Sequence, residues 1–232
     1  MKVGIIQSNY LPWRGYFDFI DEVDLFIVHD DLQFTKGDWR NRNRIKTPNG
    51  ARWITVPVHY QRTAQLICDT TVDYSQNWQR EHRNLLAASL ARAPHLEDVW
   101  RLLEPAWGAG HRTISELNVA LMSGICAYLD IRTPLRMSAE FAVTGVRTER
   151  LIELLTAVGA TTYLSGPAGR GYLDEPRFAD AGIRLEYKQY SYPPYSQLWG
   201  PFDGSLSIVD TIANCGPAAR RVLTSTPARI AA

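Results

Sequence analysis

Two short apolar runs near the start of the chain constrain its fold more than any other feature. They cover residues 3–6 and 25–28, and a proline-containing turn and a segment of helical spacing lie between them. A short apolar run bounded by polar or turn residues is typical of a strand in a parallel sheet. A strand, a helix and a second strand in such close succession predict a right-handed βαβ unit. We therefore expect an α/β protein with a parallel sheet.

Polar side chains follow both apolar runs directly. Gln7 and Asn9 come after the first run, and His29, Asp30 and Asp31 come after the second. Ligands of open α/β sheets bind beyond the carboxyl ends of the strands, so we expect the functional site there. Adjacent residues in an extended segment point in opposite directions, so only one of the two aspartates should face the cleft. The alternative role for an aspartate at a strand end is to cap a turn.

A strongly basic segment comes next. Residues 36–52 contain six basic side chains and one acidic side chain. If this segment is extended, the basic side chains at positions 40, 42, 44 and 46 share one face. Asn49 and Gly50 predict a hairpin turn, followed by a returning strand over residues 51–58. The basic face would either bind phosphate or form a solvated edge strand whose charges prevent aggregation.

The hydrophobic periodicity changes twice along the chain. Residues 1–73 are predicted to form the first part of an α/β domain with the basic hairpin, and residues 74–130 a helical insert or cap. Residues 131–216 return to alternating strands and helices, and residues 217–232 are expected to be a flexible tail. A glycine-rich turn at residues 166–171 follows a predicted strand. Its spacing is neither GxGxxG nor a P-loop, so its glycines would either line the site or supply positive φ.

Composition narrows the class of protein. The chain has 232 residues and a formal net charge of +1, so nothing global indicates nucleic acid or an anionic membrane as partner. No stretch reaches the roughly 18 to 20 apolar residues of a membrane helix. The three cysteines are widely spaced, which predicts reduced thiols in a cytoplasmic protein. No metal-ligand spacing and no GxSxG motif is present, so we predict no metal site and disfavour a covalent mechanism.

Four stretches resemble the motifs of the WbqC-like family. They are QSNYLPWRGYFDFI, DDLQFTKGDWRNRNRIK, ATTYLSGPAGRGYLD and YPPYSQLWGPFDGSLSIVDTIANCG. Ser8 stands where many members have proline, which should make the first loop less rigid. The family is associated with surface-polysaccharide and specialised-metabolite clusters, so the resemblance implies a cytoplasmic biosynthetic protein.

The opening strand, loop and helix also look like the start of the HIGH-type nucleotidyltransferases and of pantothenate synthetase. The histidine that stabilises a triphosphate in those enzymes would fall at Tyr16, next to Gly15. Its absence argues against plain adenylyl transfer from ATP. The resemblance implies a Rossmann-like fold of the HUP or nucleotidyltransferase type, and fold alone does not fix the reaction.

Together these features predict a transferase that forms an amide by acyl or aminoacyl transfer to a small-molecule amine or amino sugar. The donor would carry phosphate, as a nucleotide, an acyl-adenylate or an aminoacyl-tRNA. The reaction would use either ATP with Mg²⁺ or no cofactor, because positioning suffices for an activated donor. The alternatives are an ATP- and Mg²⁺-dependent nucleotidyltransferase-like ligase and a non-catalytic protein that binds a nucleotide sugar or RNA.

The predicted site joins the strand ends, the basic segment and the positions that match the family. Arginine and lysine would hold phosphate, and Tyr10, Trp39 and Tyr195 would stack on a base or a sugar. The predicted catalytic residues are Gln7, His29, Asp30 and Asp31. The predicted substrate-binding residues are Asn9, Tyr10, Trp13, Tyr16, Gln33, Lys36, Trp39, Arg40, Asn41, Arg42, Asn43, Arg44, Gly166, Gly169, Tyr172, Tyr195 and Gln197.

Overall fold

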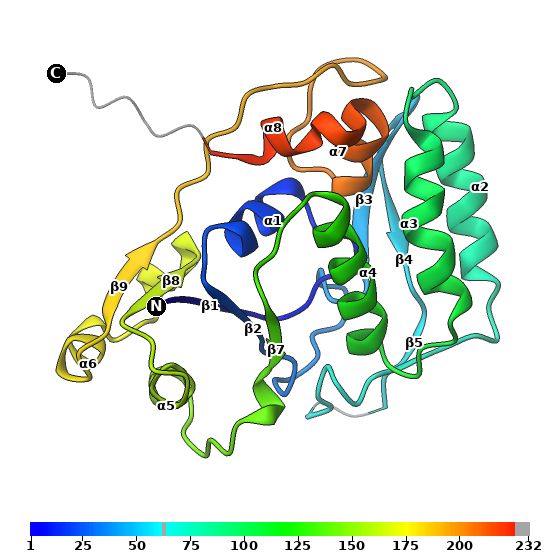
Figure 1. Cartoon of the computed structure of the whole chain (residues 1–232). Coiled ribbons are helices and arrows are strands. Elements are labelled where there is room, and N and C mark those ends of the chain that lie inside the picture. Colours follow the sequence, from blue (N-terminus) through cyan, green and yellow to red (C-terminus); the bar gives the residue numbers. More distant parts are fainter. Residues whose placement is uncertain (62–63, 226–232) are drawn as a thin grey trace, which may run out of the picture.

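A five-stranded parallel sheet lies at the centre of the fold (Figure 1). The computed structural model describes residues 1–61 and 64–225. In spatial order the strands are β7 (Leu135–Met137), β2 (Leu25–Val28), β1 (Lys2–Ile6), β8 (Thr162–Ser165) and β9 (Arg184–Tyr187). When the five strands are numbered in chain order, the spatial order across the sheet is third, second, first, fourth and fifth. This is the strand order of a Rossmann sheet. The prediction of an α/β fold with a Rossmann-like parallel sheet is confirmed.

Apolar side chains cover both faces of the sheet, as expected for buried parallel strands. α5 (Thr148–Ala157) and α6 (Glu175–Asp180) pack on the face that includes Ile27. α1 (Arg14–Asp21) packs on the opposite face, which includes Phe26. Neighbouring residues of β2 thus point to opposite faces, and helices on both sides make a layered α/β unit.

The register of β1 and β2 brings the polar residues that follow them to one level. Ile6 pairs with Val28, and the amide of His29 donates to the carbonyl of Ile6 at 3.0 Å. Gln7 and His29 therefore leave the sheet side by side at its carboxyl edge. The polar clusters that the sequence places after the two strands do meet there.

Three helices occupy the middle of the chain and pack beside the hairpin (Figure 1). They are α2 (Trp78–Leu90), α3 (Leu96–Gly108) and α4 (Ile114–Tyr128), so the helical segment expected within residues 74–130 is present. Their apolar side chains join the same buried core as α1. None of the helices in the described part of the chain is long and apolar enough to cross a membrane.

The basic segment forms a hairpin whose turn comes one residue earlier than expected. β3 (Arg42–Thr47) pairs with β4 (Gly50–Thr55), so residues 48–49 make the turn and Gly50 takes a φ of 96°. The returning strand ends at Thr55 rather than at residue 58. The remaining elements are β5 (Val58–His59), β6 (Thr71–Val72), α7 (Ile208–Cys215), α8 (Ala219–Leu223) and the 3₁₀ turns η1 (Ser138–Glu140), η2 (Pro167–Gly171) and η3 (Gly216–Ala218).

The predicted flexible tail is ordered over its first part, so that expectation is wrong for residues 217–225. α8 buries Ala219 and Leu223 against the core. The Arg220 guanidinium donates to both carboxylate oxygens of Asp21 at 2.8 Å, which fixes α8 beside α1. The rest of the predicted tail, residues 226–232, lies outside the described residues.

Candidate functional site

Two recesses flank the loop that follows β1. The first, the sheet-edge cleft, has a volume of about 520 Å³ and the second, the tryptophan cleft, about 300 Å³. Gln7 lines the first and Asn9 lines the second, and chain geometry keeps their Cα atoms within about 7 Å of each other. The sheet-edge cleft is lined by Ile5, Ile6, Gln7, His29, Leu32, Arg147, Thr148, Arg150, Leu151, Tyr163, Tyr172 and Leu173. The tryptophan cleft is lined by Asn9, Pro12, Trp13, Trp39, Asn43, Arg44 and Ser205.

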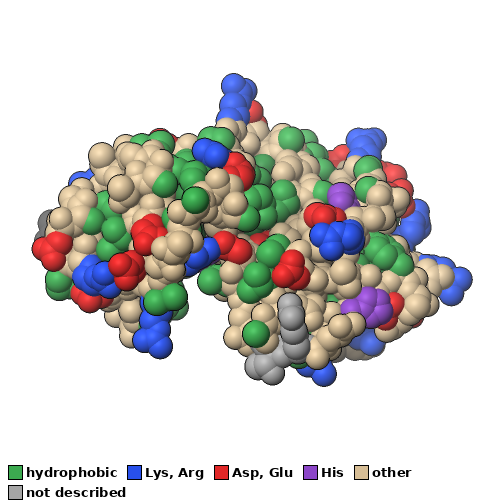
Figure 2. All heavy atoms as spheres, turned by 90° about the horizontal axis from the view of Figure 1, so that it is seen from below, with side chains coloured by type: hydrophobic (Ala, Val, Ile, Leu, Met, Phe, Trp, Pro, Cys, Tyr) green, Lys and Arg blue, Asp and Glu red, His purple; other side chains and the backbone are tan. Residues whose placement is uncertain are grey.

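The sheet-edge cleft lies where the strand order reverses. Its lining includes Ile5 of β1 and Tyr163 of β8. These two strands are parallel neighbours, and the strand order of a Rossmann-like sheet reverses between them. The first turn of α5 supplies Thr148 and Arg150, and Arg147 precedes it with a φ of 52°, in the left-handed region. Seen from below, the surface is notched between two lobes, and basic and acidic side chains both lie beside the notch (Figure 2).

Arg150 contacts His29 and Asp31, two of the polar residues that follow β2. Its Nε donates to His29 Nε2 at 3.2 Å, and its Nη2 donates to an Asp31 carboxylate oxygen. Ser138 Oγ donates to the other oxygen of Asp31. Burial, with the Arg150 charge in the same direction, lowers the pKa of His29 to about 4, although Asp31 opposes the shift. The imidazole is therefore uncharged at neutral pH and accepts at Nε2.

Asp30 points away from this cleft, as expected for one of two neighbouring aspartates. Its side chain is fully buried and accepts from the Ser8 amide at 2.7 Å, from Ser8 Oγ at 2.6 Å and from Ser115 Oγ at 2.5 Å. These bonds tie the loop after β1 to α4. A buried, fully hydrogen-bonded carboxylate cannot reach a substrate, so the predicted catalytic role does not fit Asp30.

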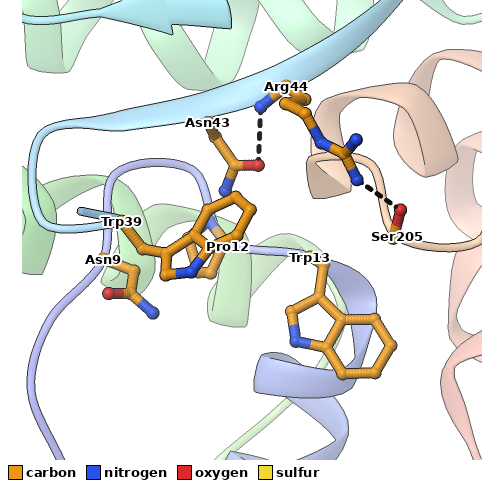
Figure 3. Close-up of a pocket in the computed structure, with 7 residues that line it drawn as sticks. All are labelled: Asn9, Pro12, Trp13, Trp39, Asn43, Arg44 and Ser205. Atoms are coloured by element: carbon orange, nitrogen blue, oxygen red, sulfur yellow. Dashed lines mark hydrogen bonds between the residues drawn. The ribbon is translucent and has the colours of Figure 1, made fainter. Parts of the chain in front are cut away.

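The tryptophan cleft lies between two indoles (Figure 3). Trp13 and Trp39 stand on two sides of an open space, and the Arg44 guanidinium donates to Ser205 Oγ at 2.7 Å above it. Asn43 Nδ2 donates to the carbonyl of Leu11 at 2.9 Å and so supports the loop under the cleft, where Leu11 has a φ of 45°. These contacts give the cleft two flat apolar walls and one positive charge.

The basic residues of the hairpin do not form one uniform face. Arg42 lies over the Trp53 ring, 4.2 Å from its centroid. Lys46 is buried and donates to Gln197 Oε1 at 2.6 Å. Arg40 lies before β3 and donates to the Ser8 carbonyl at 3.1 Å. Lys46 is thus occupied by internal contacts, whereas Arg42 is partly exposed and lies over an exposed ring.

Two predicted stacking rings are internal. Tyr10 is fully buried, and its hydroxyl donates to His82 Nδ1 at 3.0 Å. Tyr16 is buried as well, and its hydroxyl donates to the Gln7 carbonyl at 2.8 Å. Neither ring is available to a substrate, so the predicted contacts of these two residues do not fit the structure.

Two further predicted contacts hold the chain that runs from β9 to α7. The Tyr195 hydroxyl and the Gln197 amide both donate to Asp210 Oδ2 at 2.6 Å. Asn41 likewise donates to the Val56 carbonyl at 2.8 Å and closes the hairpin. These side chains stabilise the walls of the site rather than line either cleft.

The other predicted residues divide between the cleft and the surface. Tyr172 is 71% exposed at the mouth of the sheet-edge cleft. Gly166 and Gly169 line neither cleft and do not take positive φ, so neither predicted role fits them. A Cβ at Gly169 would lie 2.3 Å from Ser165 Oγ, so close packing is the reason for this glycine. Gln33 and Lys36 are exposed and line neither cleft within the described chain.

Several residues of the two clefts and their rim escape the sequence reasoning, among them Arg147, Arg150, Ser205 and Trp53. Arg150 lies in a helix whose charges the amphipathic pattern assigns to solvent. Trp53 pairs with Arg44 across the hairpin, and a correct turn position would have identified it. Within residues 1–61 and 64–225, no group of three His, Cys, Asp or Glu side chains is placed to hold a metal ion.

The comparisons with known proteins agree with the motifs. The family model of the WbqC-like protein family matches residues 7–222. A curated protein of Mycobacterium tuberculosis (strain ATCC 25618 / H37Rv), named uncharacterized protein Rv1507c, is 44% identical over 218 residues, which cover 93% of this chain and 94% of the relative. No solved structure matches the chain. The chain belongs to the WbqC-like protein family.

Proposed function

We propose that this protein is a biosynthetic transferase that moves an acyl or aminoacyl group from a phosphate-containing donor to an amine. The observation that carries the proposal is the sheet-edge cleft. Two arginines and an uncharged histidine line this cleft at the place where the strand order reverses. Nucleotides bind at this point in Rossmann-like sheets. Arg147 and Arg150 would hold the donor phosphate by charge-assisted hydrogen bonds.

The reaction needs no covalent intermediate. The amine nitrogen attacks the acyl carbonyl carbon, a C–N bond forms, and the C–O bond to the donor breaks with the electron pair on the leaving oxygen. His29 Nε2 would take the proton that the amine loses, once a donor phosphate draws the Arg150 Nε away from this nitrogen. Burial is the main cause of the low pKa of His29 and the Arg150 charge adds to it, so a phosphate that offsets this charge would make the imidazole a better base. Asp31, 3.7 Å from His29 Nε2, would stabilise the imidazolium.

The acceptor would occupy the neighbouring tryptophan cleft. Its walls suit the flat apolar face of a sugar or a ring, and Asn9 offers an amide oxygen that is buried and has no hydrogen-bond partner among the described residues. Gln7 and Asn9 are separated by one residue, so groups held in the two clefts can meet at this loop.

The strand order gives some support to a second candidate, a nucleotidyltransferase that uses ATP and Mg²⁺. Tyr16, at the place of the missing histidine, is buried against the Gln7 carbonyl and offers no contact to a triphosphate. Release of AMP and pyrophosphate during amide formation would identify this second reaction.

A calorimetric titration tests the donor site. Ligands are ATP with and without Mg²⁺, nucleotide sugars, and charged and uncharged tRNA. We expect one of these to bind, and Arg150→Ala to weaken its binding at least about tenfold, because a charge-assisted hydrogen bond contributes about 1.5–3 kcal/mol. Arg132→Ala, which removes an exposed arginine paired with Asp130, is the control and should bind like the wild type. Equal affinity of Arg150→Ala and wild type would place the donor elsewhere.

A further inference from the structure

Aromatic surface continues from the tryptophan cleft onto the outside of the hairpin. Trp39 lines the cleft, and its ring centroid lies 5.1 Å from that of Trp53, which lies on β4 outside the cleft lining. The two side chains are 39% and 44% exposed. Paired exposed indoles beside a cleft indicate a binding surface rather than a part of the core.

Positive charge lies directly on this aromatic surface. The Arg42 and Arg44 guanidinium groups lie 4.2 Å and 5.9 Å from the Trp53 ring centroid. The Nε atoms of both arginines are buried and have no hydrogen-bond partner among the described residues. Flat rings that alternate with guanidinium groups can stack bases and neutralise phosphates at the same time.

We propose that the hairpin platform, formed by Trp39, Arg42, Arg44 and Trp53, binds the single-stranded end of an RNA. The tryptophan cleft, at about 300 Å³, is at the lower limit of small-molecule pockets and takes about one nucleotide. The next base would stack on Trp53, and the intervening phosphate would contact the two arginines. Stacking of this kind tolerates any base.

The inference deepens the proposed function, and only the identity of the RNA as acyl donor depends on that function. An RNA donor seated in the tryptophan cleft would carry its acyl group toward the Gln7–Asn9 loop, and donor and acceptor would then occupy the opposite clefts to those assigned above. A free mononucleotide would fill the tryptophan cleft and leave Trp53 uncovered. A duplex keeps its bases stacked on each other and cannot use the rings.

Fluorescence anisotropy with a dye-labelled RNA tetranucleotide tests the platform without any turnover. We expect the single strand to bind more tightly than AMP and than a duplex of equal length. Trp53→Ala should weaken binding at least ~5-fold, the smallest effect of losing one base–aromatic stack, whereas Trp53→Phe should retain most of it. The matched control is Tyr74→Ala, which removes an aromatic ring that is 39% exposed and lies outside the platform and should leave affinity unchanged. Thermal melting checks that each variant is folded.

The salt dependence gives a second readout. Arg42→Ala should reduce the slope of log affinity against log salt by about 0.7, the value for one phosphate contact on a single strand. Equal RNA binding by Trp53→Ala and wild type, or binding of AMP as tight as that of the tetranucleotide, would overturn the platform. Binding of charged tRNA that Trp53→Ala weakens and Arg150→Ala leaves unchanged would count against the donor site in the sheet-edge cleft but not against the platform.

Discussion

At the residue scale, neighbouring side chains of one type have different roles. Asp30 is buried and binds Ser8 and Ser115, whereas Asp31 binds Ser138 and Arg150 at the sheet-edge cleft. The alternation of an extended segment predicts that only one of them faces the cleft. It does not predict which one, because each aspartate also has a partner far along the chain: Ser115 is 85 residues from Asp30, and Arg150 is 119 residues from Asp31.

His82 makes the stability of the protein depend on pH. Burial lowers its pKa to about 4, and its ring is uncharged between the Tyr10 hydroxyl and the Thr55 carbonyl. The unfolded chain, with a pKa near 6.5, binds a proton more readily, so the stabilisation is complete above about pH 6.5 and is lost as pH falls toward 4. Between pH 7 and pH 5 we expect the free energy of unfolding to fall by on the order of 2 kcal/mol because of His82.

Urea denaturation at pH 7 and pH 5 measures this effect. His82→Gln can keep both hydrogen bonds without a titrating group, so its stability should fall less between the two pH values than that of the wild type. His29 titrates in the same window and leaves part of the slope in place. His59→Gln, at an exposed histidine, should behave like the wild type. An unchanged slope in His82→Gln would contradict the account of His82.

At the scale of elements, the sequence predicts the sheet and the hairpin well and the chain end poorly. The apolar runs predict β1 and β2 because these strands are buried on both faces. The hairpin turn is predicted one residue late, because Gly50 takes positive φ as the first residue of β4 rather than within the turn. α8 has only five residues and two of them are arginines, so composition alone suggests a tail.

The packing of α8 can be tested at one position. Leu223 is buried against the main core, so Leu223→Ala should lower the free energy of unfolding by about 2–4 kcal/mol. Thr224→Ala changes the exposed neighbouring residue and should cost less than about 0.5 kcal/mol. Chemical denaturation of the two variants gives both values. A similar small effect at both positions would mean that α8 does not pack as described.

At the scale of the whole molecule, the fold brings distant segments to one edge of the sheet. Residues from β1, β8, the segment after β2 and the first turn of α5 contribute to the sheet-edge cleft, whereas the hairpin and the segment before α7 complete the tryptophan cleft. The sequence predicts the edge from the polar strand ends. It does not predict Arg150 or Ser205, because their places depend on the strand order and on the packing of the chain between β9 and α7.

An acyl-transfer assay with hydroxylamine as a general amine acceptor tests whether the protein is a transferase. The donors are a labelled aminoacyl-tRNA pool and an acyl-adenylate, and the product is the labelled hydroxamate. We expect the protein to form hydroxamate from at least one donor. Arg150→Ala should form it at a rate about 100-fold lower, the size of effect seen when one stabilising charge or hydrogen-bond donor is removed. Hydroxamate formation at the rate of the enzyme-free control with both donors would contradict the proposed function.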